Sequence, residues 1–78
     1  MASNTYNDMM KIIYDYVPKE KADEVVGRQM SKSEQTIDTL DINGYKKIMM
    51  ALSCSVTLYV ADSGKRAELV DKIKAMGQ

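Results

Sequence analysis

Hydrophobic residues recur along most of the chain at the three- and four-residue spacing of an α-helix. Each repeating segment has apolar positions on one side and charged or polar positions on the other. This pattern predicts helices at residues 4–16, 18–32, 42–61 and 64–76. The sequence therefore predicts an all-α fold, a single domain built as a small bundle of about four helices.

The breaks between these segments carry recognisable helix signals. Ser3 or Asn4 is expected to cap the first helix, and Pro18 suits the first turn of the second. Asp38, Thr39 or Asp41 is expected to cap the third helix, and Ser63 the fourth. Ile37, Leu40 and Ile42 are expected to hold the connection before the third helix against the core.

The third segment is the central one because residues 48–61 contain no charged side chain, although 28% of the chain is Asp, Glu, Lys or Arg. A surface helix normally carries charge on its outer side. Read as one helix, this segment has two apolar faces. The main face, expected in the core, contains Tyr45, Ile48, Met49, Leu52, Val56, Tyr59 and Val60, and the second face contains Met50, Cys54, Leu58 and Ala61.

A strand is the alternative for residues 55–60, which are rich in β-branched and aromatic side chains. Such a strand would need a partner, and residues 36–42 are the only other segment with a suitable composition. That segment is short and contains two aspartates. The helix is the preferred interpretation.

The amino-acid composition excludes most kinds of catalytic site and metal site. The chain has no histidine and one cysteine, so histidine-based hydrolytic triads and most zinc sites are excluded. Cys54 lies in the uncharged segment, where a buried structural thiol is expected rather than an activated nucleophile. Thr39 and Met50 stand where a calcium-binding EF-hand loop requires carboxylates. No catalytic, cofactor-binding or metal-binding residue is predicted, and the protein is not expected to be an enzyme.

The charge balance of the chain and the length of its uncharged segment argue against two classes of partner, nucleic acids and membranes. Eleven basic and eleven acidic residues balance and are interspersed, which argues against a nucleic-acid or membrane surface. The basic residues of the last helix, Lys65, Arg66, Lys72 and Lys74, alternate with Glu68 and Asp71. The uncharged segment is too short to span a bilayer. With one cysteine and no signal-peptide pattern, a cytoplasmic location is expected.

A glycine in the second helix and a tyrosine in the first each have two possible roles. Gly27 falls inside the second helix, where it either allows a close helix crossing or weakens the helix. Tyrosine is enriched at protein interfaces, so Tyr14 is a candidate for partner contact as well as for the core.

A pattern of short elements resembles a known class of module. Tyr16, Val17 and Pro18 precede a helix with Ala22, Val25 and Val26, and residues 59–62 (Tyr-Val-Ala-Asp) precede a helix that begins with Lys and Arg. This arrangement resembles the short helical interaction domains appended to bacterial roadblock-type and other signalling proteins. The resemblance implies a regulatory role in bacteria through protein contacts, and it transfers no functional residue.

These observations predict a non-catalytic protein-interaction or regulatory module. Its partner would be another protein or a second copy in a homodimer, and no small-molecule substrate or cofactor is indicated. The expected partner-binding residues are Met50, Cys54, Leu58 and Ala61, because three short helices are not expected to cover both faces of the third, and Tyr14, because tyrosine is enriched at interfaces. The alternative is a small helical nucleic-acid-binding regulator.

Overall fold

The computed structural model of the protein describes residues 1–78 and is all-helical. It consists of α1 (Asn4–Tyr14), α2 (Lys19–Lys32), α3 (Ile42–Val56) and α4 (Ser63–Met76), with a short 3-10 helix, η1 (Thr57–Tyr59), directly after α3. There is no strand, so the alternative interpretation of residues 55–60 is wrong. The predicted small helical bundle is confirmed.

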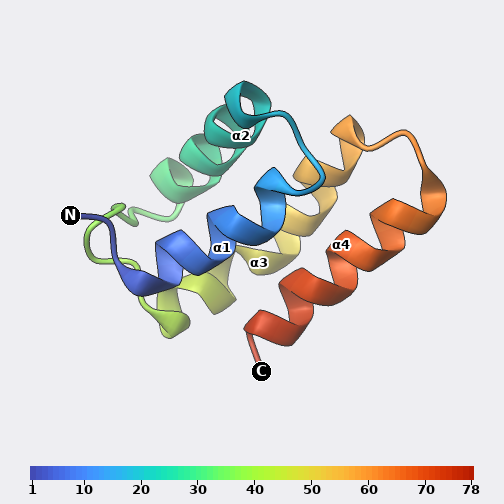
Figure 1. Ribbon diagram of the computed structural model, residues 1–78. Coiled ribbons are helices and arrows are strands. Elements are labelled where there is room, and N and C mark those ends of the chain that lie inside the picture. Colours follow the sequence, from blue (N-terminus) through green and yellow to red (C-terminus); the bar gives the residue numbers. More distant parts are fainter.

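The helices form two layers (Figure 1). In the front layer α1 lies between α2 and α4 and contacts both, and α3 lies behind them and contacts all three. All of the helices that cover α3 are therefore on one side of it. This arrangement decides which of its two apolar faces is buried.

Side chains cap three of the four helices, as the sequence pattern suggests. Ser3 Oγ accepts a hydrogen bond from the N–H of Tyr6 (3.1 Å), and Asp41 Oδ1 accepts one from the N–H of Gly44 (2.8 Å). At the start of α4 the predicted cap is wrong by one residue, because Asp62 and not Ser63 caps the helix. Its Oδ1 accepts a hydrogen bond from the N–H of Lys65 (3.0 Å). Each such bond satisfies one of the free N–H groups of a first helical turn.

Two helices end earlier than predicted. The first ends at Tyr14 rather than at residue 16, and the third ends at Val56 rather than at residue 61. The hydroxyl of Thr57 donates a hydrogen bond to the carbonyl of Ser53 (2.8 Å), and the chain tightens into η1. Because a 3-10 helix turns faster than an α-helix, it rotates the side chains that follow. Tyr59, expected in the core, is 41% exposed.

The core is made of aliphatic, methionine and tyrosine side chains, without Phe or Trp. The phenol of Tyr45, which is fully buried, donates a hydrogen bond to the carbonyl of Ile73 in α4 (2.7 Å). Burial raises the pKa of Tyr45 to about 12. The buried hydrophobic residues are Met9, Met10, Ile13, Val17, Ala22, Val25, Val26, Met30, Leu40, Tyr45, Ile48, Leu52, Val56, Val60, Leu69 and Ile73.

The connection between α2 and α3 is held to the core by one side chain. Leu40 is buried as predicted, whereas Ile37 and Ile42 are 47% and 40% exposed, so the prediction that all three contact the core is wrong for two of them. The chain leaves α2 through Glu34, which has a left-handed backbone conformation (φ 58°). This turn directs the segment toward the start of α1.

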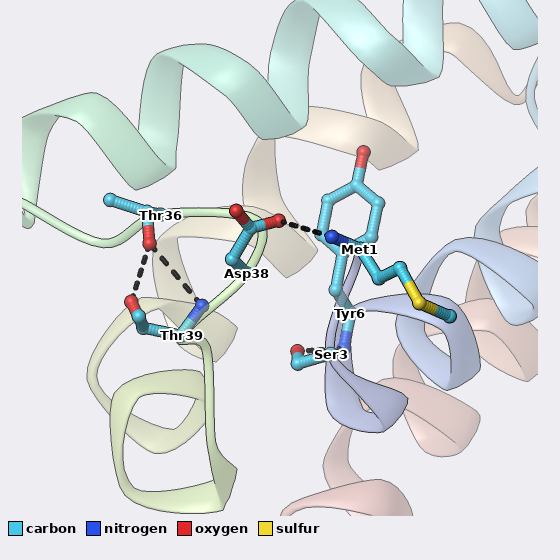
Figure 2. Close-up of polar contacts among 6 residues, drawn as sticks. All are labelled: Met1, Ser3, Tyr6, Thr36, Asp38 and Thr39. Carbon is cyan, nitrogen blue, oxygen red and sulfur yellow. Dashed lines mark hydrogen bonds and ion pairs between the residues drawn. The ribbon is translucent and has the colours of Figure 1, made fainter.

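Polar contacts fix the tip of this connection (Figure 2). The hydroxyl of Thr36 interacts with that of Thr39 and accepts a hydrogen bond from the N–H of Thr39 (3.3 Å). The amino group of Met1 lies 3.5 Å from Asp38 Oδ1. These contacts join the connection to the start of α1, although both charged groups are well exposed and their pairing adds little stability.

Candidate functional site

The outer face of α3 carries a run of exposed apolar side chains. Tyr45, Ile48 and Leu52 point toward the other three helices and are buried. The residues on the opposite side, Met50, Ala51, Cys54 and Leu58, are exposed; we call them the outer stripe. Three of them are in α3, and Leu58 follows in η1.

Both large side chains of the outer stripe are well exposed. Met50 is 57% exposed and Leu58 is 83% exposed. Scattered single hydrophobic residues are ordinary on a protein surface, whereas a group of exposed apolar side chains on one side of a helix and of the turn after it is less common. The stripe is therefore the strongest candidate for contact with another molecule.

The expectation that Cys54 is a buried structural residue is wrong. Its side chain is exposed, because α1, α2 and α4 all pack against the opposite side of α3. Its place on the second apolar face was nevertheless predicted correctly. Ala51 was missed, although the same helical spacing places it between Met50 and Cys54, because a small residue gives a weak hydrophobic signal.

Ala61 does not extend the stripe as predicted, and Tyr14, predicted separately as a candidate for partner contact, lies elsewhere. Ala61 is exposed, but it lies beyond η1 in the connection to α4, so helical spacing does not place it on the face of α3. Tyr14 belongs to a different surface, a groove between α1 and α2 that no residue of α3 lines. The structure thus divides the predicted partner-binding residues between two regions.

The groove between α1 and α2 has a volume of about 530 Å³. At one end the phenol of Tyr14 donates a hydrogen bond to Asp23, and the ammonium of Lys19 lies 3.0 Å from the other oxygen of the same carboxylate. The hydrogen bond from Tyr14, followed by that from Lys19, lowers the pKa of Asp23, and the same bond to Asp23 raises the pKa of Tyr14. The polar groups at this end are therefore already paired within the chain.

Gly27 lines this groove, and neither interpretation from the sequence describes its surroundings fully. A Cβ atom built on Gly27 would have no neighbour within 4 Å, so no helix crosses closely there. The helix continues through Gly27 without a break to Lys32. The glycine leaves open space along the groove, beside Val26 and Met30.

The basic side chains of α4 are exposed but do not form a continuous basic surface. Glu68 and Asp71 alternate with them along the helix. The ammonium of Lys72 lies 4.9 Å from the centre of the Tyr16 ring, a cation–π contact. The side chain of Arg66 donates a long hydrogen bond to the carbonyl of Ala61 (3.5 Å). Two of the four basic side chains thus already have a contact within the chain.

No cluster of three or more Asp, Glu or Cys side chains is arranged to hold a metal ion. None of the four helices combines the length and the apolar composition needed to cross a membrane. Comparison of the chain with models of protein families, with curated proteins and with solved structures finds no match. The resemblance to the appended helical domains of bacterial signalling proteins stays a prediction, as do the bacterial origin and the cytoplasmic location.

Proposed function

We propose that the protein is a non-catalytic interaction module that binds another protein chain through the outer stripe of α3. The observation that supports this best is the exposure of Met50 and Leu58 on a helix face that carries no charge over its C-terminal half. Burying such side chains in a partner gains about 25 cal/mol per Å² of apolar surface. An outer face that served only as solvent-exposed surface would be expected to carry charge.

The shape of the stripe fits a helix or groove of a protein rather than a small molecule. Neither of the two concave surfaces of the chain includes Met50, Cys54 or Leu58, so the stripe is not hollowed. Small-molecule sites are concave and surround most of their ligand. A convex apolar helix face instead suits helix packing by ridges and grooves.

A photo-crosslinking experiment tests this proposal. A photoreactive amino acid replaces Ala51 in the stripe or Arg28, which is exposed on α2, and each protein is irradiated in an extract of its native host. We expect a discrete protein adduct at position 51 and none at position 28. The adduct should disappear in the Met50→Lys, Leu58→Lys variant. Equal adduct patterns at the two positions, or no adduct at position 51, would contradict the proposal.

The nucleic-acid alternative has its own test. Basic groups that neutralise phosphates give affinity that falls steeply with salt. If the alternative holds, the purified protein is retained on DNA or RNA at about 50 mM salt, and replacing Lys65 and Arg66 with Gln abolishes the retention. We expect no retention, because Glu68 and Asp71 interrupt the basic residues of α4.

A further inference from the structure

We propose that the outer stripe binds a second copy of this chain, with the two α3 helices packed antiparallel about a two-fold axis near Ala51 and Cys54. This inference rests on the proposed function, because it names the partner of the same surface. The distribution of charge along α3 supports it, the order of large and small side chains is compatible with it, and the length of the exposed face limits its strength.

Charge differs between the two ends of the outer side of α3. Lys46 and Lys47 are exposed near its start, and neither forms an ion pair within the chain. The last turn has no basic side chain to offset the negative end of the helix dipole, where the hydroxyl of Thr57 donates to the carbonyls of Ser53 (2.8 Å) and Cys54 (3.1 Å). An antiparallel pair places the lysines of each copy beside the negative helix end of the other. A parallel pair would place lysines against lysines.

The order of side chains along the stripe is compatible with the same symmetry. In a two-fold antiparallel pair, residues at equal distances from the axis face each other. An axis midway between Ala51 and Cys54 sets these two small residues opposite each other across the interface, where they permit close approach of the helices. The same axis sets Lys47 opposite Leu58 of the second copy. The aliphatic part of the lysine can then cover the leucine while its ammonium reaches the helix end.

The length of the stripe limits the strength of the contact. With 15 residues, α3 is roughly 22 Å long at 1.5 Å per residue. One helix pair of this length buries an area at the low end for specific protein interfaces. The dimer should therefore depend on concentration, with a dissociation constant in the micromolar range or weaker.

Sedimentation equilibrium of the purified chain over a wide concentration range provides the first test. The mean mass should rise from 8.8 kDa toward twice that value as the concentration increases. Leu58→Lys should keep the helical circular dichroism and the thermal midpoint of the wild type and stay monomeric throughout. If this variant still forms dimers, the outer stripe is not the interface.

Removing the charge of Lys47 distinguishes an antiparallel from a parallel pair of α3 helices. Each contact of a cation with a helix end is worth about 0.3–1 kcal/mol, and the dimer has two such contacts, so Lys47→Gln should weaken dimerisation about 3- to 30-fold. Lys21→Gln, an unpaired lysine exposed on α2, is the matched control and should leave the dissociation constant unchanged. Stronger dimerisation of Lys47→Gln would show parallel lysines repelling each other and would overturn the antiparallel arrangement.

The native cysteine supplies a second, independent measurement. A short bis-maleimide should join two wild-type chains through Cys54 at concentrations where the dimer is populated. A Cys54→Ser, Lys21→Cys variant, with its only thiol on the exposed side of α2, should give no such product. Equal yields from the two proteins would indicate random collision.

The failure of this inference can be told apart from failure of the proposed function. A chain that is monomeric at about 1 mM and is not joined by the bis-maleimide refutes the second copy. If the photoreactive group at position 51 still captures a different protein that Leu58→Lys does not bind, the proposed function stands. If the group captures nothing, both proposals are wrong.

Discussion

Leu52 and Leu58 lie six residues apart near the end of α3, and their surroundings are opposite. Leu52 is fully buried beneath the front layer of helices, and Leu58 is 83% exposed on the outer side. Both faces are apolar over the C-terminal half of α3, although the outer side also carries Lys46 and Lys47 near the helix start. The difference shows that the packing of α1, α2 and α4 on one side only, rather than hydrophobicity itself, makes one face core and leaves the other open.

Truncating the two leucines gives the largest contrast. Leu52→Ala removes a buried side chain and leaves a cavity, so it should lower the free energy of unfolding by about 2–5 kcal/mol. Leu58→Ala should change it by no more than about 0.5 kcal/mol. Urea denaturation of dilute protein, where dimers do not contribute, measures both. Similar losses in the two variants would mean that the outer face is also covered.

Removing the phenol of Tyr45 tests the polar contact on the inner face. Its hydroxyl hydrogen-bonds to the carbonyl of Ile73, one of the last four carbonyls of α4, which lack partners along their own helix. Tyr45→Phe should cost about 1–3 kcal/mol of unfolding free energy. Tyr59→Phe, whose exposed ring makes no side-chain hydrogen bond, is the control and should be close to neutral.

The same phenol predicts a pH dependence. Because the pKa of Tyr45 is raised from 10.0 to about 12, the folded state favours the protonated phenol. This contribution to stability is complete below pH 10 and is lost as the pH rises toward 12. The thermal midpoint of the wild type should therefore fall more steeply over this range than that of Tyr45→Phe. Parallel curves would contradict the role given to this group.

Substituting two glycines, one beside open space and one in a packed position, should change stability by smaller amounts. Gly27→Ala adds a methyl group in open space and should raise stability by about 0.5–1 kcal/mol, since alanine is the better helix former. Gly44→Ala is the counterpart, because its Cβ would lie 2.5 Å from Gln35 Oε1 and 3.2 Å from Leu40 Cδ1. It should gain less or be destabilising. Thermal denaturation of both variants ranks them.

The smallest effect is expected at Cys54. Cys54→Ser should alter the unfolding free energy by no more than about 0.5 kcal/mol, because the side chain is exposed. In dilute wild-type protein the thiol should react with a maleimide without prior unfolding. A thiol that reacts only after urea is added would show that the outer face is covered in the monomer.

The sequence was sufficient to predict the architecture because helical spacing and capping residues are local signals. The four helices exist where the pattern places them, although two end early, and the caps at Ser3 and Asp41 are among the candidates that the sequence offered. The two apolar faces of α3 were also visible in the sequence. The exposure of Cys54 was not, because it depends on where α1, α2 and α4 pack.

The surroundings of two tyrosines also could not be predicted from helical spacing. Tyr59 is exposed because the 3-10 turn at Thr57 changes the helical period on which its predicted position relied. Tyr14, the last residue of α1, is paired with Lys19 and Asp23, which lie on α2. Such partners follow from how the first two helices pack, which spacing within one helix does not determine.

The methionines of the core and of the outer stripe should differ in how readily they are oxidised. Met9, Met10 and Met30 are buried, whereas Met50 stands open on the outer stripe. A mild oxidant should therefore convert Met50 to the sulfoxide well before the buried three, placing a polar group at the start of the outer stripe while the fold persists. If the proposed function holds, oxidation of Met50 would weaken binding through the outer stripe before it affected the fold, and a methionine sulfoxide reductase would restore the binding.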